Sequence, residues 1–96
     1  MVYKNLIRMK YSPVQNYING KFVDASSQRT LDVISPLDGN LLSTVPMSTA
    51  KDLDDAVKAA KEAFPKWSKT PIKERVQVFF RYKTLLEKHL IELSEL

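Results

Sequence analysis

The sequence predicts an α+β chain in which two β-hairpins precede two long helices. Three observations support this prediction: an Asn-Gly pair between short apolar runs, a proline-led turn sequence between two further runs, and a second half whose apolar residues recur at helical spacing. With 96 residues, the chain has room for one small domain. We expect the hairpins to span residues 17–47 and the helices to span residues 50–64 and 71–96.

The first predicted hairpin is centred on Asn19-Gly20. This pair separates two short apolar runs, residues 17–18 and 21–23. Asn-Gly favours a type I′ turn, because both central residues of that turn need a positive φ. We therefore expect the two runs to pair as antiparallel strands.

A second hairpin is predicted around the turn sequence Pro36 to Asn40. Residues 24–29 are small and polar, and we interpret them as a loop. Thr30 to Ser35 follows as a strand, and Leu41 to Met47 returns beside it. Proline presets φ at the start of the turn and Gly39 accepts a left-handed conformation, so this stretch favours a chain reversal.

The first predicted helix spans residues 50–64. Its apolar residues recur at i, i+3, i+4 and i+7, as one face of an α-helix requires. Thr49 with Asp52 three residues later resembles a capping box in which Asp takes the usual place of Glu or Gln. Asp54 and Asp55 add negative charge at the positive end of the helix dipole. We expect Pro65 to weaken or end this helix.

The second predicted helix begins at Thr70-Pro71, an N-cap followed by a proline in the first turn, and runs through residues 71–96. Its apolar residues cover roughly two thirds of a helical wheel, whereas a surface helix usually shows a stripe a little over 100° wide. The residues that widen the arc are Val78, Phe80, Tyr82, Leu85, Ile91 and Leu96. One helix and one sheet face do not cover such a surface. We therefore expect the opening part of a larger protein, or a subunit that does not stand alone.

Composition excludes several classes of function. The sequence contains no cysteine, which rules out disulfides, thiolate metal sites and a cysteine nucleophile within these residues. The net charge is +4, but basic and acidic residues are interleaved, which argues against a nucleic-acid partner. No apolar run approaches the about 20 residues of a membrane span, so we expect no membrane partner. Residues 1–15 are interpreted as a flexible basic leader.

The residues themselves predict no catalytic and no cofactor-binding site. His89 is the only histidine, and no second ligand lies at metal-binding spacing, so we interpret it as structural or exposed. The cluster of Asp52, Asp54 and Asp55 is explained by the helix dipole and does not need a metal. With two glycines in the chain, no glycine-rich phosphate loop is present.

The order of these features resembles the amino-terminal end of the aldehyde dehydrogenase superfamily. The matching residues are Tyr17 to Val23, Ser35 to Gly39, Val45-Pro46, Asp52 to Ala60, Ala63 to Trp67 and Arg75. Phe80 to Leu86 is most similar to the coenzyme-A-acylating branch of the superfamily, the methylmalonate-semialdehyde dehydrogenases. The resemblance covers residues 16–96. Ser35 and Leu37-Asp38 depart from residues that are common in the family, in a turn that Asp38-Gly39 still forms.

The resemblance implies a parent enzyme with a catalytic domain, an oligomerisation arm and a Rossmann-like NAD-binding domain, whose opening part is this chain. It also implies that a cysteine thiolate attacks a semialdehyde, that hydride passes to NAD, and that the acyl group passes to coenzyme A. The fragment itself is expected to be inactive and to bind no cofactor. The resemblance further implies a structural monovalent cation held by the backbone carbonyl of Ile34.

The resemblance implies a homo-tetrameric parent, located in the cytoplasm or, in a eukaryote, in the mitochondrial matrix. We expect the chain to self-associate through the helix of residues 71–96 or to bind the missing remainder of the parent. The alternative hypothesis is a self-contained interaction module, which docks on a partner protein through the apolar face of that helix.

Overall fold

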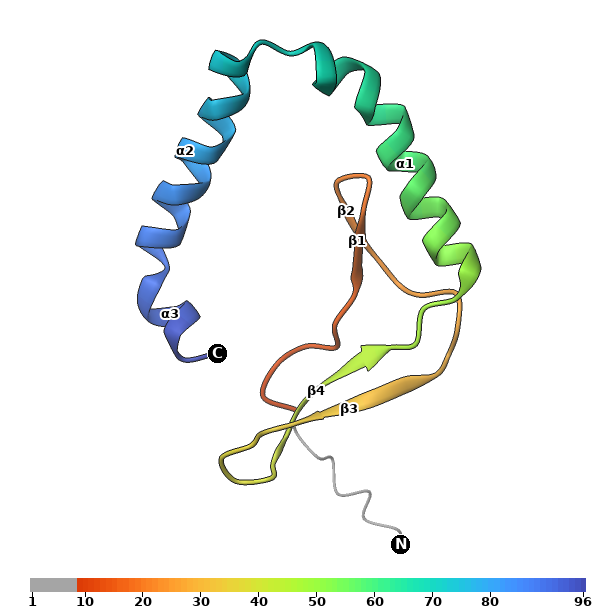
Figure 1. Cartoon of the computed structure of the whole chain (residues 1–96). Helices are drawn as coiled ribbons and strands as arrows, with labels where there is room; N and C mark the ends of the chain where they lie inside the picture. The colour runs from red at the N-terminus through yellow and green to blue at the C-terminus, as the bar shows by residue number, and fades with distance from the viewer. Residues whose placement is uncertain (1–8) are drawn as a thin grey trace, which may run out of the picture. The chain divides into compact units, whose positions relative to one another are not determined.

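The computed structural model describes residues 9–96, and these form four strands followed by three helices (Figure 1). The elements are β1 Asn16–Ile18, β2 Lys21–Val23, β3 Thr30–Ile34, β4 Leu41–Pro46, α1 Ala50–Lys69, α2 Ile72–Lys88 and α3 Leu90–Ser94. The predicted order of two hairpins and then helices is confirmed. The chain divides into two compact units after Glu62.

β1 and β2 form an antiparallel hairpin in which Tyr17 lies opposite Phe22. Asn19 has a φ of 53° and Gly20 a φ of 76°, which confirms the turn expected from this pair. The rings of Tyr17 and Phe22 meet edge to face with their centroids 5.0 Å apart. This cross-strand aromatic pair adds to the stability that the turn provides.

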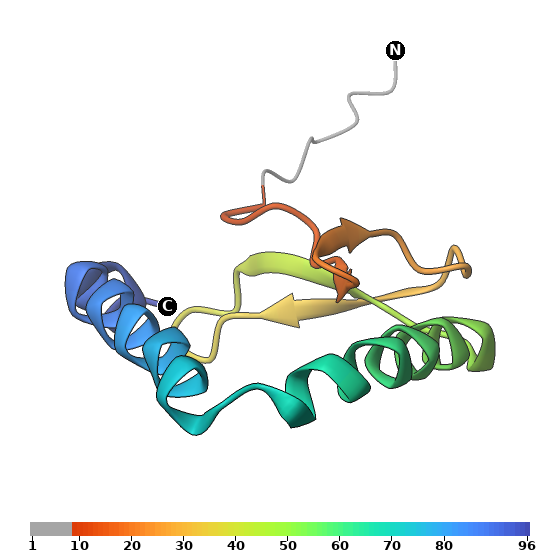
Figure 2. The ribbon, with the colours of Figure 1, turned by 90° about the horizontal axis from the view of Figure 1, so that it is seen from above.

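β3 and β4 run side by side in opposite directions and form the second hairpin (Figure 2). The pairing is irregular between Val33 and Ile34, at the end of β3. The turn closes through the Ser35 N–H, which donates to the Asn40 carbonyl at 2.8 Å. Gly39 has a φ of 75°, so the predicted left-handed position is also confirmed.

Residues 11–14 lie along β4 and extend the second hairpin. The hydrogen bonds run from Tyr11 N–H to Leu42 O and from Val14 N–H to Thr44 O, each at 2.8 Å, and from Ser43 Oγ–H to Ser12 O at 2.7 Å. The prediction of a flexible leader through residue 15 was therefore wrong for this stretch, because it satisfies backbone groups at the edge of β4. Residues 1–8 of the predicted leader lie outside the described residues.

α1 ends at Lys69, whereas the predicted helix stopped before Pro65, so the predicted boundary was wrong. A proline this close to the end of a helix removes one backbone donor and leaves the remaining turns able to form. The last carbonyls of α1 find other donors in Thr70. Its N–H bonds to the Trp67 carbonyl at 3.1 Å and its Oγ1–H to the Lys66 carbonyl at 2.9 Å.

Thr70 thus completes α1 and is not the N-cap of the next helix, as the sequence had predicted. The N-cap of α2 is Pro71, which makes no side-chain cap hydrogen bond. Its carbonyl accepts the N–H groups of Glu74 at 3.0 Å and of Arg75 at 3.1 Å. The start of α2 therefore depends on the preset backbone of proline and not on a hydroxyl cap.

The prediction of one helix over residues 71–96 was wrong, because the helix is divided at His89 into α2 and α3. His89 leaves the helical region with φ −105° and ψ 20°. The junction still satisfies its backbone, because the His89 N–H donates to the Leu85 carbonyl at 3.0 Å and the His89 carbonyl accepts the Leu93 N–H at 2.9 Å. No proline or glycine marks the position, so the sequence pattern predicted an unbroken helix.

No hydrophobic side chain is buried within the part of the chain that the structure describes. The two buried residues are polar: Ser43 is 4% exposed and Asp52 is 8% exposed. Large apolar side chains of strands and helices alike are exposed, among them Phe22, Leu31, Phe64 and Phe79. Much of the apolar surface that folding normally buries therefore stays open within the described residues. Among the helices of residues 9–96, none combines the length and apolar character that crossing a membrane requires.

Gly20→Val is expected to lower the free energy of unfolding of the first hairpin by about 1–2 kcal/mol. A Cβ at this position meets no atom within 4 Å, so the cost comes from a β-branched residue at a φ of 76° and not from a clash. Hydrogen exchange of the β1 and β2 amides, measured along a urea series, checks it. Gly20→Asn is the matched control, because Asn tolerates positive φ. Equal effects of Val and Asn would contradict the expectation.

Candidate functional site

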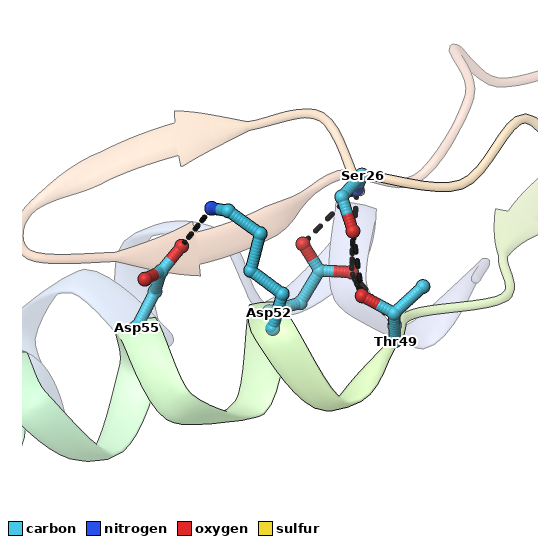
Figure 3. Close-up of polar contacts among 5 residues, drawn as sticks. Ser26, Thr49, Asp52 and Asp55 are labelled. Carbon is cyan, nitrogen blue, oxygen red and sulfur yellow. Dashed lines mark hydrogen bonds and ion pairs between the residues drawn. The ribbon is translucent and has the colours of Figure 1, made fainter.

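The carboxylate of Asp52 is the most extensively hydrogen-bonded side-chain group among the described residues (Figure 3). Its Oδ2 accepts the Thr49 N–H at 2.7 Å, and its Oδ1 accepts the Ser26 N–H at 3.0 Å. Thr49 precedes α1, whereas Ser26 lies in the loop between β2 and β3. One carboxylate therefore fastens that loop to the beginning of α1.

Only one of the two hydrogen bonds of the predicted capping box is present. Asp52 reaches back to the Thr49 N–H, as the third residue of a capped helix does. The Thr49 hydroxyl, however, lies against Asp52 Oδ2 at 3.2 Å and against Ser26 Oγ, and does not accept the Asp52 backbone N–H. The loop serine thus takes part in a cap that the sequence predicted as purely local.

Three oxygen–oxygen contacts in this cluster share only two hydroxyl protons. Ser26 Oγ and Thr49 Oγ1 each lie 3.2 Å from Asp52 Oδ2 and also contact each other. Each hydroxyl has a single proton, so at most two of the three contacts are hydrogen bonds at any moment. The arrangement fits a relay in which one hydroxyl donates to the other and the second donates to the carboxylate.

The donors around Asp52 stabilise its charged form. The Thr49 backbone N–H, the largest cause, lowers the pKa of Asp52 below its ordinary 3.8, the Ser26 N–H and both hydroxyls lower the pKa further, and desolvation opposes these effects. The carboxylate oxygens are occupied by N–H and O–H groups. We therefore interpret Asp52 as a structural acceptor and not as a general base or a metal ligand.

The neighbouring acidic residues do not extend this cluster into a metal site. Asp55 pairs with Lys51 Nζ at 2.8 Å on the exposed surface of α1. His89, about half exposed, contacts Glu92 Oε2 through Nδ1 at 3.1 Å. Across residues 9–96, no group of three His, Cys, Asp or Glu side chains is placed to hold a metal ion.

Ile34, the residue whose carbonyl was predicted to bind a monovalent cation, is the last residue of β3. It pairs with Leu41 at the strand irregularity. Asp38, in the turn that follows, accepts the Asn40 N–H at 3.0 Å, and this bond lowers the pKa of Asp38. Within the described residues, the stretch thus offers a backbone oxygen without a cluster of carboxylates beside it. Further ligands would have to come from elsewhere, and the cation site stays a prediction.

The apolar surface of α2 and α3 is the largest feature of the second unit that the polar contacts leave unexplained. All six residues that widen the predicted apolar arc are exposed, and Ile91 is 77% exposed. A shallow hollow of about 390 Å³ lies on α2, lined by Phe80, Arg81, Thr84 and Leu85. The spacing of apolar residues in the sequence predicted this surface. The role of Ser26 was not predicted, because no local spacing links that residue to Asp52.

Comparisons with known proteins agree with the resemblance found in the sequence. Residues 22–96 match the aldehyde dehydrogenase family. Over 83 residues the chain is 48% identical to malonate-semialdehyde dehydrogenase 1 of Geobacillus thermodenitrificans and 45% identical to malonate-semialdehyde dehydrogenase 2 of Geobacillus kaustophilus. Each match covers 86% of this chain and 17% of the relative, so the chain spans about a sixth of their length.

A solved structure is also similar. It belongs to a protein from Sinorhizobium meliloti described as a methylmalonate-semialdehyde dehydrogenase, in complex with NAD. The two structures agree with a TM-score of 0.83 at 36% sequence identity. The match covers 91% of this chain and 18% of that protein.

Asp52→Asn is expected to remove one component of the acid sensitivity of folding. Because the pKa of Asp52 is lowered in the folded state, its charge adds stability above pH 3.8, and this contribution is lost as the pH falls through the folded-state pKa. The unmodified chain should therefore lose more stability on acidification than Asp52→Asn. Urea midpoints at neutral pH and below pH 3.8 check this.

Asp54→Asn is the matched control for that measurement. Asp54 lies on the same turn, is exposed, and takes part in none of the side-chain hydrogen bonds found in residues 9–96. Its variant should keep the acid sensitivity that Asp52 confers. Parallel pH profiles for the unmodified chain and Asp52→Asn would show that the contacts of Asp52 do not favour its charged form.

Proposed function

This chain belongs to the aldehyde dehydrogenase family, and we propose that it is the amino-terminal part of an NAD-dependent, coenzyme-A-acylating malonate- or methylmalonate-semialdehyde dehydrogenase. The parent enzyme would oxidise a semialdehyde to an acyl-CoA through a cysteine thioester. The observation that carries the proposal is the similarity of 86% of the chain to malonate-semialdehyde dehydrogenases. Since the chain spans 17% of these relatives, the activity is proposed for the parent and not for the 96 residues.

The open apolar surface supports a role within a larger domain. Burying a single Phe or Leu side chain is worth about 1.5–3 kcal/mol, and the described part of this chain buries none of them. The remainder of a parent protein would supply the missing cover. In such a protein, the exposed residues of α2 would become part of the hydrophobic core.

The residues of this chain contribute a scaffold to the proposed enzyme. The Asn19-Gly20 turn sets the first hairpin, and Asp52 ties the following loop to α1. The chain has no cysteine, so the nucleophile of the proposed reaction must be provided elsewhere in the parent.

The cofactors likewise belong to the remainder of the parent. Gly20 and Gly39 both lie in hairpin turns, whereas a dinucleotide-binding loop needs glycines between a strand and a helix. The described residues therefore offer no glycine-rich loop of this kind. In the parent, bound NAD would accept hydride and coenzyme A would accept the acyl group.

We extend the proposal to a homo-tetrameric parent in the cytoplasm, or in the mitochondrial matrix in a eukaryote. The competing hypothesis is a self-contained module that binds a partner protein through α2. The reading frame of the gene separates the two. Continuation beyond the codon of Leu96 into a segment that contains a cysteine would favour the enzyme, whereas a stop codon there would favour the module.

The isolated chain is expected to bind no NAD and to form no NADH from malonate semialdehyde, because it lacks the glycine-rich turn and the thiolate that the reaction needs. Isothermal calorimetry with NAD and an absorbance assay for NADH check this. The full-length Geobacillus thermodenitrificans relative serves as the positive control. Binding of NAD to the isolated chain at micromolar concentrations would contradict the expectation.

A chimera tests the proposal directly. We expect the Geobacillus thermodenitrificans relative to remain active when the matching 83 residues of this chain replace its own. The kcat/KM should stay within about tenfold, a change in barrier below about 1.4 kcal/mol, because the grafted residues are a scaffold. The assay measures NADH and acyl-CoA formed from malonate semialdehyde with NAD and coenzyme A.

The matched control for the chimera carries Phe80→Glu and Ile91→Glu, which place charges on the apolar surface and should prevent assembly. A chimera that folds and assembles but oxidises no semialdehyde would contradict the proposal. Formation of free acid and NADH without acyl-CoA would contradict its coenzyme-A-acylating part.

A further inference from the structure

We propose that the isolated chain binds a second copy of itself through α2 and α3, with the two helical segments antiparallel. The inference goes beyond the proposed function, because it concerns a contact between two copies of this chain and requires neither cofactor nor substrate. Three features of the structure support it: the exposed apolar surface of α2, the area left open, and the distribution of charge along the two helices.

The surface of α2 has the shape that a like helix can fill. Phe80 with Thr84 and Arg81 with Leu85 form two adjacent i, i+4 rows, and these four residues line the hollow of about 390 Å³. Side-chain rows of this kind can pack into the grooves of a second helix. Exposed apolar residues also lie on the rest of α2 and in α3, among them Val76, Val78, Phe79, Tyr82, Leu86 and Ile91.

The open apolar surface of α2 and α3 is extensive. Twelve large apolar side chains between Ile72 and Leu96 are exposed. A standard protein interface buries about 800 Å² on each partner. A contact along α2 and α3 can draw on these side chains for the apolar part of such an interface.

Charge selects the antiparallel arrangement. The first part of the helical region is basic, with Lys73, Arg75, Arg81 and Lys83 against Glu74; the second part is acidic, with Glu87, Glu92 and Glu95 against Lys88. Antiparallel copies place opposite charges together, whereas parallel copies place like charges together.

Sedimentation of the isolated chain at tens of micromolar tests the contact. We expect a dimer, and we expect Phe80→Glu with Ile91→Glu to convert it into a monomer. The matched control is Leu37→Glu with Leu53→Glu, which places the same number of charges on exposed residues of the first unit and should leave the dimer intact. A monomeric unmodified chain would overturn the proposal, as would a control that dissociates equally.

A charge exchange tests the orientation without altering the apolar residues. One variant carries Lys73→Glu and Arg75→Glu, and the other carries Glu92→Lys and Glu95→Lys. Each alone should dimerise at least tenfold more weakly, because like charges meet in an antiparallel pair. The mixture should form a heterodimer, because opposite charges meet again. A mixture that associates no better than either variant alone would overturn the antiparallel arrangement.

The remainder of an aldehyde dehydrogenase is the main competing occupant of this surface. A chain that is monomeric alone and binds only a Geobacillus thermodenitrificans relative lacking its matching residues would refute self-association. That outcome would leave the proposed function intact. Conversely, an inactive chimera would count against the proposed function without affecting the sedimentation result.

Discussion

Asp52 holds together two segments that lie far apart in the sequence, because its carboxylate accepts N–H groups from both Ser26 and Thr49. Ser26 lies in the loop that follows the first hairpin, and Thr49 directly precedes the first helix. The course of the chain around the second hairpin therefore begins and ends at one side chain. The described residues contain no buried hydrophobic side chain. This polar contact therefore helps to hold the two segments in place, as an apolar core would do in a self-sufficient domain.

The helices lack a comparable anchor and instead present apolar surface. α2 forms from its own backbone bonds and from local pairs such as Lys83 with Glu87, whose atoms lie 3.1 Å apart. Nothing in the second unit covers the exposed side chains of α2. Stability of these helices must therefore come mainly from whatever buries them, either the rest of a parent enzyme or a second copy of this chain.

The same residues indicate that this chain is a structural part of the proposed enzyme and not the place where its reaction occurs. The hairpins and α1 are defined by turns, a helix cap and backbone pairing, and the carboxylate at the cap is occupied by hydrogen-bond donors. The proposed reaction needs a thiolate and a dinucleotide, and under that proposal both would lie outside this stretch. The chain therefore contributes structure and apolar surface to the proposed enzyme. It would assist catalysis by supporting the parts of the enzyme that carry out the reaction.

The sequence by itself determined the features that depend on neighbouring residues. Asn19-Gly20 specified its turn through backbone sterics, the spacing of Thr49 and Asp52 specified the start of α1, and the apolar periodicity specified helices with an uncovered face. The tertiary structure decided the pairing of residues 11–14 with β4 and the role of Ser26, because those partners lie far along the chain. It also decided the continuation of α1 past Pro65 and the break at His89, since the cost of a lost helix bond depends on which other donors and acceptors lie within reach.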